Sequence, residues 1–301
     1  MNGARDSKAG SDWLVLAALV VAWGSAFAAL KIAVHDFPPA WNTVARLWVA
    51  TATMLIVALA RGERPPRFSL AKDSPWRAYA WVGSVGLAIP FVMFAFAATR
   101  LPSAVNAICN GASPLFTAAL AQLLLADERL GWRKFAGVGL GFVGLVVLVA
   151  PRLASGGSLE ALALASAIFG AFLYAVSNII TRKAPPVSAL SGALMMCSVG
   201  AVLATIWAVA TTPLPPMPSA EAWAAVTALG VFSSALGSVG YVYLVQRRGP
   251  VFMSMSIYLA PLWATALGVA VLGERPGWPA YLALALILAG VGLTTTPAFR
   301  R

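Results

Sequence analysis

The stretch from Leu101 to Trp132, LPSAVNAICNGASPLFTAALAQLLLADERLGW, decides the fold because it occurs twice. The second copy runs from Gly249 to Trp278 as GPVFMSMSIYLAPLWATALGVAVLGERPGW. Both copies have a proline near the start, a proline followed by leucine further on, and Glu-Arg and Gly-Trp pairs at the end. Unrelated apolar helices share composition but rarely share such an ordered set of landmarks. We therefore interpret the chain as two related halves, residues 1–151 and 152–301.

The composition is typical of a membrane protein. Hydrophobic residues make up 60% of the 301 residues and charged residues only 10%, whereas a soluble protein carries about 25% charged residues. The net charge of +11 comes from lysines and arginines between apolar runs, where contact with the membrane surface explains them better than nucleic acid does. The two cysteines, Cys109 and Cys197, lie inside apolar runs, so we expect no disulfide framework.

A membrane-spanning helix needs about 20 mainly apolar residues. The chain contains ten runs of this kind, and we predict an all-α polytopic membrane protein with ten transmembrane helices. The predicted spans are Trp13–Val34, Ala40–Ala60, Trp76–Ala98, Pro102–Leu125, Trp132–Ala150, Leu159–Thr181, Val187–Ala210, Ala222–Gln246, Pro250–Leu272 and Trp278–Thr296.

The lysines and arginines predict the orientation of these spans. Sixteen of the 21 fall on one side of the membrane and four on the other, and Arg46 lies within a span. Cytoplasmic loops carry the excess of positive charge, so both termini are expected in the cytoplasm. Each half holds an odd number of spans, so the second five-helix repeat is inverted relative to the first. Inverted repeats with a substrate site near the midplane are a recurring design of secondary transporters.

Polar and aromatic residues at mid-depth predict a substrate cavity between the halves. Trp23 to Phe27 in the first span have a counterpart at Tyr174 to Asn178 in the sixth. Ordinary helix packing is the alternative role for both segments, and Asn106 and Asn110, on one face of the fourth span, could also hold helices together. The predicted substrate-binding residues are Trp23, Ser25, Phe27, Phe91, Phe94, Asn106, Asn110, Tyr174, Ser177, Asn178, Ser238, Tyr241, Ser254 and Tyr258.

Glycines and prolines deep in four spans predict hinges. Proline removes a helical hydrogen bond and kinks the helix, and a span that bends at mid-depth suits a gate. Static kinks are the alternative. The predicted hinge residues are Gly86, Pro90, Gly111, Pro114, Gly237, Gly240 and Pro261.

Several of these motifs together resemble a known family. They are Trp23-Gly24-Ser25-x-Phe27, Arg46 early in the second span, Pro114-Leu115, Glu128-Arg129-Leu130, Pro261 and Glu274-Arg275. Their order over nearly the whole chain is similar to the EamA family of the drug/metabolite transporter superfamily, although no single motif is specific. The resemblance implies a five-plus-five inverted-repeat fold and export of small metabolites. Within the family, the chain is similar to YddG-type bacterial exporters of aromatic and other neutral amino acids.

The residues that are absent narrow the function further. No Asp or Glu lies near the middle of a predicted span, and the only histidine, His35, lies in a loop. An intramembrane enzyme is therefore disfavoured, and we expect no metal or cofactor. Phosphorylated cargo needs cationic partners at the midplane. Arg46 is the one buried cation, and it lies in the outer third of its span, so nucleotide sugars and sugar phosphates are disfavoured as substrates.

We therefore expect a secondary transporter of the bacterial inner membrane that exports small neutral metabolites, foremost aromatic or hydrophobic amino acids. We expect it to work by alternating access, with the substrate and the lipid bilayer as its partners and without nucleic acid. Export of other metabolites or drugs, and a channel-like facilitator, remain as alternatives.

Overall fold

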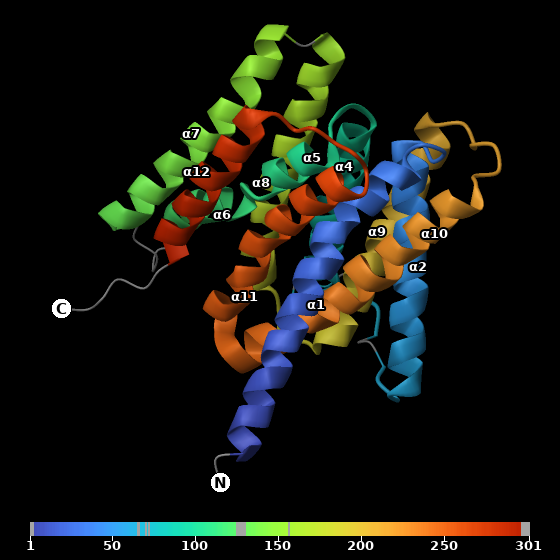
Figure 1. The fold of residues 1–301 in the computed structure, drawn as a ribbon. Helices are drawn as coiled ribbons and strands as arrows, with labels where there is room; N and C mark the ends of the chain where they lie inside the picture. Colours follow the sequence, from blue (N-terminus) through green and yellow to red (C-terminus); the bar gives the residue numbers. More distant parts are fainter. Residues whose placement is uncertain are drawn as a thin grey trace.

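The computed structural model describes residues 3–64, 67–69, 71, 73–124, 131–155 and 157–295 (Figure 1). For some helical residues, among them 245–255, 257 and 258, only the backbone is described. The elements are α1 (Gly3–Ala33), α2 (Pro39–Ala60), α3 (Pro75–Gly83), η1 (Ser84–Ala88), α4 (Ile89–Arg100), α5 (Ser103–Asn110), α6 (Ser113–Leu124), α7 (Trp132–Ser155), α8 (Ser158–Lys183), α9 (Ala189–Thr211), α10 (Ala220–Ala228), η2 (Leu229–Leu236), α11 (Gly237–Ala270) and α12 (Trp278–Thr295).

All regular secondary structure in the described part of the chain is helical, which confirms the all-α architecture. Seven of its helical stretches are long and apolar enough to cross a membrane: Ser11–Ala33, Pro39–Ala60, Pro75–Arg100, Ser103–Leu124, Ser158–Thr181, Ala189–Thr211 and Ala220–Tyr241. Three shorter apolar helices cover Phe135–Pro151, Leu259–Ala270 and Trp278–Leu293. The chain is therefore a multi-pass membrane protein, and the layout of ten spans stays a prediction.

One predicted boundary is wrong. The sequence predicts a loop between Gln246 and Pro250, but α11 continues through it from Gly237 to Ala270. Its 34 residues are too long for one crossing, because a bilayer core is only about 30 Å thick and a helix rises about 1.5 Å per residue. Figure 1 shows that the ribbon of α11 reverses its direction at one end. The chain thus turns back without leaving the helical conformation.

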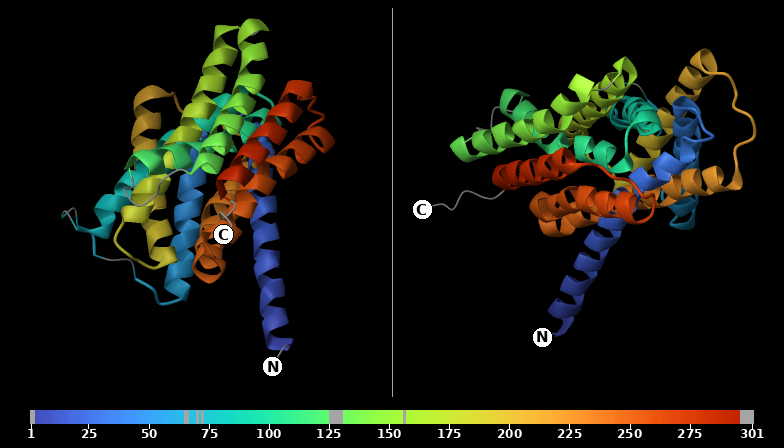
Figure 2. Two further views of the ribbon diagram at one scale, coloured as in Figure 1. Left: turned by 90° about the vertical axis from the view of Figure 1, so that its left-hand side faces the viewer. Right: turned by 45° about the horizontal axis from the view of Figure 1, so that its top comes forward.

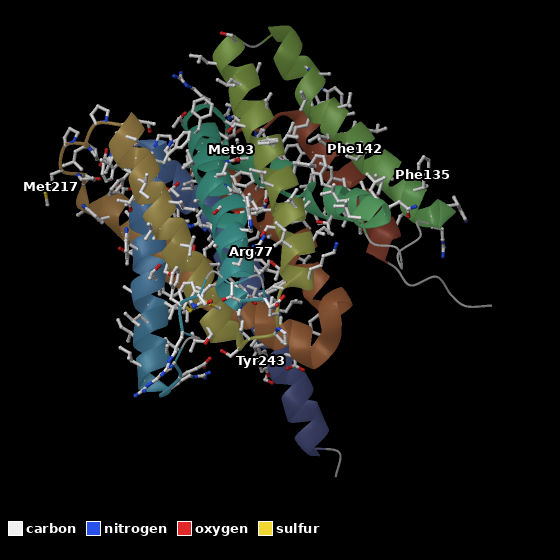
Figure 3. The ribbon with its side chains drawn as sticks, turned by 180° about the vertical axis from the view of Figure 1, so that it is seen from behind. Arg77, Met93, Phe135, Phe142, Met217 and Tyr243 are labelled. Carbon is white, nitrogen blue, oxygen red and sulfur yellow. The ribbon has the colours of Figure 1, made fainter. Side chains whose placement is uncertain are left out.

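Helices from the two halves of the chain pack on one another. α7 lies along α12, α2 along α9, α1 along α11, and α4 along α8 (Figures 1 and 2). Polar contacts accompany this packing: Ser166 on α8 donates to the Met93 carbonyl of α4 at 3.1 Å, and Tyr243 on α11 donates to Asp12 on α1 at 3.2 Å. Figure 3 labels Met93 and Tyr243 at these two contacts. The halves are therefore interleaved, and any cavity between helices draws on both.

Two of the membrane-spanning stretches contain a turn of π-helix. η1 interrupts the stretch from α3 to α4, and η2 interrupts the stretch from α10 to α11. Leu87 in η1 and Ser233 in η2 are 146 residues apart, the same separation that relates Glu128 to Glu274. π-helical turns are rare and occur frequently at functional sites. The two interruptions thus occupy equivalent positions of the repeat and mark a candidate functional region.

The predicted hinge residues lie at or near irregular points of the helices. Gly86 is inside η1, and Pro90 is the second residue of the helix that follows it. Gly111 separates α5 from α6, and Gly237 begins α11 directly after η2. Pro114 is the second residue of α6, whereas Gly240 and Pro261 are inside α11. Whether these points bend during transport stays a prediction.

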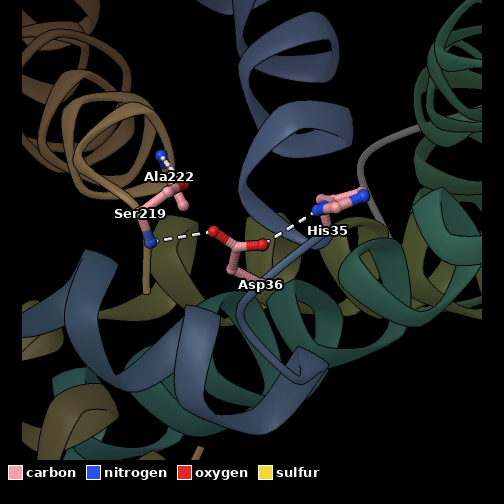
Figure 4. A network of polar contacts seen from close by, with 4 residues as sticks. All are labelled: His35, Asp36, Ser219 and Ala222. Atoms are coloured by element: carbon pink, nitrogen blue, oxygen red, sulfur yellow. Dashed lines mark hydrogen bonds and ion pairs between the residues drawn. The ribbon is translucent and has the colours of Figure 1, made fainter. Parts of the chain in front are cut away.

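A polar cluster ties the segment between α1 and α2 to the start of α10 (Figure 4). The Asp36 carboxylate accepts the Ser219 backbone N–H at 2.8 Å and lies 2.8 Å from His35 Nδ1. Hydrogen bonds from Ser219, and then from His35, lower the pKa of Asp36 to about 2. Ser219 in turn caps α10 by accepting the Ala222 backbone N–H. Asp36 therefore remains ionised and holds two halves of the chain together at this end.

Candidate functional site: a cavity between the two halves

A cavity of about 290 Å³ lies among helices from both halves. Its walls are mostly apolar and aromatic, and serine, asparagine and one arginine side chain provide the polar groups. The lining residues are Trp23, Ala26, Phe27, Leu30, Arg46, Leu87, Phe91, Phe94, Asn110, Ser113, Tyr174, Asn178, Cys197, Ser233, Ser234, Ser238, Tyr241, Ala260 and Pro261. A volume of this size suits a small metabolite.

Trp23 forms one wall because the facing helix has a glycine opposite it. A Cβ at Gly237 would lie 2.6 Å from Trp23 Nε1, so only glycine lets the indole approach. The indole N–H donates to the Ser233 carbonyl at 3.2 Å. The Trp23 ring also lies 6.3 Å from the Tyr241 ring, centroid to centroid. The Trp23 side chain, which extends from α1, is thus held in place by η2 and the start of α11.

Phe94 forms the opposite aromatic wall. Its ring meets Phe27 edge to face at 6.2 Å between centroids and lies 5.4 Å from the ring of Tyr174. A Cβ at Gly170 would lie 3.1 Å from Phe94 Cε2, so α8 approaches closely at that glycine. A second contact between the halves is built in the same way, since a Cβ at Gly240 would lie 3.0 Å from Leu19 Cδ2. Both walls therefore depend on large side chains packed on glycine.

The neutral polar groups of the cavity are only partly satisfied. Ser238 donates to the Ser234 carbonyl at 2.6 Å, and Asn178 Nδ2 lies 3.4 Å from Thr117 Oγ1. Asn110 Oδ1 has no hydrogen-bond partner among the described residues. A buried amide oxygen without a partner is costly, and a donor on a bound substrate would satisfy it.

Arg46 is the one charged side chain among the described residues that line the cavity. Its Nε donates to Ser234 Oγ at 2.9 Å and its Nη2 to Ser233 Oγ at 3.2 Å. Its Cζ lies 3.8 Å from the centre of the Phe91 ring. The Arg46 guanidinium, on α2, is therefore held by η2 of the other half and by one aromatic face, and none of its contacts among the described residues is a carboxylate.

Nine of the predicted substrate-binding residues line this cavity, three do not, and the side chains of two are not described. Asn106 is fully buried and donates from Nδ2 to the Phe94 carbonyl at 2.9 Å, which is a helix-packing role. Ser25 accepts the Trp263 indole N–H at 3.0 Å, and Ser177 packs against Gly86. The side chains of Ser254 and Tyr258 lie outside the described residues. The residues brought together are Trp23, Phe27, Phe91, Phe94, Asn110, Tyr174, Asn178, Ser238 and Tyr241.

The prediction did not include several lining residues. Arg46 was the only lysine or arginine that was assigned to neither face of the membrane, and that exception could have identified it. Ser233 and Ser234 are consecutive, and an α-helix would turn them to different directions. In η2 both hydroxyls nevertheless contact one guanidinium. Among the described residues, no group of three or more His, Cys, Asp or Glu is placed to hold a metal ion.

The comparisons with known proteins agree with this architecture. The EamA-like transporter family matches residues 11–150 and again residues 158–296. An inner membrane transporter of Escherichia coli K12 named YedA, whose function is uncharacterized, is 28% identical over 93% of this chain and 89% of its own length. A probable terminal-alkyne amino-acid exporter of Streptantibioticus cattleyicolor is 30% identical, over 91% of this chain and 90% of its own.

More distant similarities point the same way. A probable amino-acid metabolite efflux pump of Salmonella typhimurium is 28% identical over 57% of this chain and 54% of its own length. A solved crystal structure with 23% identity has a TM-score of 0.67 and covers 95% of this chain and 96% of that one, which shows a shared fold. The helical membrane architecture and the two family matches lead to one conclusion: this chain belongs to the EamA-like transporter family.

Proposed function

We propose that this transporter exports small neutral metabolites, foremost amino acids with aromatic or hydrophobic side chains, out of the cytoplasm. The observation that carries the proposal is the cavity itself, whose aromatic walls surround a few neutral hydrogen-bonding groups and one arginine. Aromatic walls bury an apolar side chain, and the polar groups orient the backbone part of an amino acid. The relatives named as amino-acid exporters support the same substrate class.

We further propose that the substrate crosses by alternating access in the inner membrane, with both termini in the cytoplasm. The distribution of positive charge supports the orientation, and the inner-membrane relative supports the location. Inverted repeats would let the two halves exchange conformations around a central site. The irregular turns at η1 and η2 supply points at which a span can bend.

Substrate counterflow in proteoliposomes tests the proposal. Vesicles preloaded with unlabelled phenylalanine, leucine, a nucleoside or a cationic dye are diluted into the labelled form of the same compound. We expect transient accumulation of the label for the two amino acids and not for the nucleoside or the dye, with protein-free vesicles as control. Exchange of dye or nucleoside alone would contradict the substrate class. Flux at channel rates without counterflow would indicate a facilitator instead of a carrier.

A further inference from the structure

Arg46 is a buried charge without a counter-ion in the described protein. Its side chain is 8% exposed, and its polar contacts are the hydroxyls of Ser233 and Ser234. The one ion pair found among the described residues joins His35 and Asp36 and does not involve Arg46. Removing a guanidinium from water is costly unless an anion or several hydrogen bonds compensate. A buried, unpaired charge within a membrane-spanning helix therefore has a functional role by default.

The geometry leaves part of this guanidinium free to bind. A guanidinium carries five N–H groups in a planar fork. The printed contacts of Arg46 use Nε and Nη2, one bond each, so Nη1 has no partner among the described residues. Phe91 covers one face of the fork and the two serines fix its orientation. A planar donor held in this way, at the wall of a cavity, matches the two oxygens of a carboxylate.

The rest of the cavity limits the class of anion. No other cation is found among the described lining residues, and a phosphate, with more than one negative charge, would be left undercompensated. The aromatic walls favour an apolar body attached to the anion. The described part of the lining also contains no Asp or Glu to pair with an ammonium group. These features point to a substrate with one carboxylate and an apolar tail, whose amino group contributes less to binding.

We infer that Arg46 is the carboxylate-binding residue of the cavity, and that the carboxylate, not the amino group, is what the transporter requires of its substrate. This rests on the proposed function and deepens it, because it names the chemical group that is recognised. The amino group of an amino acid is then held by neutral acceptors such as Asn110 Oδ1, which has no partner among the described residues.

Ligand binding to the purified full-length protein tests the inference separately from transport. The four probes are L-phenylalanine, L-phenylalaninamide, 3-phenylpropanoate and 3-phenylpropanamide, and the readout is quenching of tryptophan fluorescence or thermal stabilisation. We expect both carboxylates to bind at least about ten times more tightly than the amide of the same skeleton, the difference typical of hydrogen bonds to a charged group. Equal binding of acid and amide, or no binding by any probe, would overturn the inference.

Two variants sharpen the test. Arg46→Gln should weaken the carboxylates by about ten- to a hundredfold and leave the amides unchanged, and Arg46→Lys should fall between them because it keeps the charge but not the fork. Arg100→Gln, at an exposed site, is the matched control for loss of one charge. A merely structural Arg46 would lower the affinity for all four probes alike, and that result would refute the role. Should Arg46→Gln fail to fold, the acid-to-amide ratio of the wild type still decides.

These experiments distinguish failure of the role assigned to Arg46 from failure of the proposed transport function. If the carboxylates bind as expected but L-phenylalanine shows no counterflow, amino-acid transport is wrong and the anion site stands. If L-phenylalanine shows counterflow and its amide competes equally, transport stands and the role of Arg46 is wrong.

Discussion

Glu274 caps the N-terminus of α5 by accepting the backbone N–H of Ser103 at 2.7 Å and its hydroxyl at 2.9 Å. Lys31 lies at the same corner of the chain, where its Nζ donates to the carbonyls of Ala98 and Leu101 at 2.8 and 3.0 Å. An anion is thus placed at the start of one helix and a cation at the end of the preceding one, as the helix dipoles favour. These contacts join α1, the α4–α5 corner and the segment before α12, and they close one end of the bundle.

The first prediction is that Glu274 holds this end closed. Glu274→Ala should remove the cap, destabilise the closed arrangement by about 1 kcal/mol, and raise the accessibility of the cavity from the side on which Glu274 lies. The measurement is the labelling rate of a cysteine at Leu30 with a membrane-impermeant maleimide, in a chain that carries Cys197→Ser because both residues line the cavity. Glu221→Ala, at an exposed glutamate in the first turn of α10, is the control. Equal labelling rates in both backgrounds would show that the cap does not gate.

The second prediction concerns the close contact between η1 and α8. A Cβ at Gly86 would overlap Ser177 Oγ and lie 2.9 Å from Ser177 Cβ. Gly86→Ala should therefore lower the free energy of unfolding by about 1–3 kcal/mol through overpacking, and Ser177→Gly in the same chain should recover part of it. Gly139→Ala, where a Cβ would meet nothing within 4 Å, is the matched control and should be neutral. Thermal unfolding in detergent measures all three; a stable Gly86→Ala would contradict the packing.

The third prediction separates two asparagines one helical turn apart. Asn106→Ala should lower stability by about 1 kcal/mol, because its bond to the Phe94 carbonyl is lost, and it should change substrate affinity little. Asn110→Ala should leave the unfolding temperature unchanged and weaken substrate affinity, because this side chain lines the cavity. Unfolding curves and counterflow kinetics of both variants provide the comparison. The reverse pattern would assign the structural role to Asn110.

The fourth prediction is the orientation of the chain. Met217, in the segment between α9 and α10, is 94% exposed, and Figure 3 shows it pointing away from the helices. Cysteines introduced as Met217→Cys and Arg67→Cys should react with an impermeant reagent from opposite sides of the membrane, Met217→Cys from outside the cell. The native Cys109 and Cys197 are buried and give a low background. Labelling of both positions from one side would exclude the predicted orientation.

The fifth prediction is that transport needs no coupled ion. No Asp or Glu lines the described part of the cavity, so no carboxylate is available there to carry a proton. A zwitterion moves without net charge, so the membrane potential, about 2.3 kcal/mol per charge per 100 mV, should not change the equilibrium. Uptake into sealed proteoliposomes should reach the external concentration and stop there. Accumulation above it under an imposed pH gradient or a valinomycin potential would demonstrate ion coupling.

The sequence predicts well the features that follow from composition, such as the helical membrane class. It predicts poorly the features that depend on how helices pack, such as the turns of π-helix. Few charges and long apolar runs are sufficient to predict a helical membrane protein, because a bilayer leaves few other options. The turns of π-helix are not predictable, because nothing in Ser84 to Ala88 distinguishes a π turn from an α turn. The loop expected at Arg247 and Arg248 is helical in α11, although the chain still reverses its direction within this element (Figure 1).

The candidate site shows the same division. Aromatic residues at mid-depth, such as Trp23 and Phe94, were identifiable because the membrane interface could not explain them. The helical face shared by Asn106 and Asn110 could not show which amide reaches the cavity, because that depends on how α5 packs. The serines that hold Arg46 come from the other half of the chain. Only the fold brings them together.

The contacts of Phe94 with Gly170 and of Leu19 with Gly240 make the two halves structurally unequal. Phe94 and Gly240 occupy equivalent positions, as do Leu19 and Gly170, which each precede Trp23 and Tyr174 by four residues. Both bulky partners therefore belong to the first half, Leu19 in its first span and Phe94 in its third, and both glycines belong to the second half. If the chain works by the proposed alternating access, exchanging the conformations of the two halves does not reproduce an equivalent structure, so the inward-facing and outward-facing states should differ in energy. We expect half-saturation concentrations to differ between the two faces of the membrane, although a carrier without a coupled ion still brings its substrate to the same final ratio.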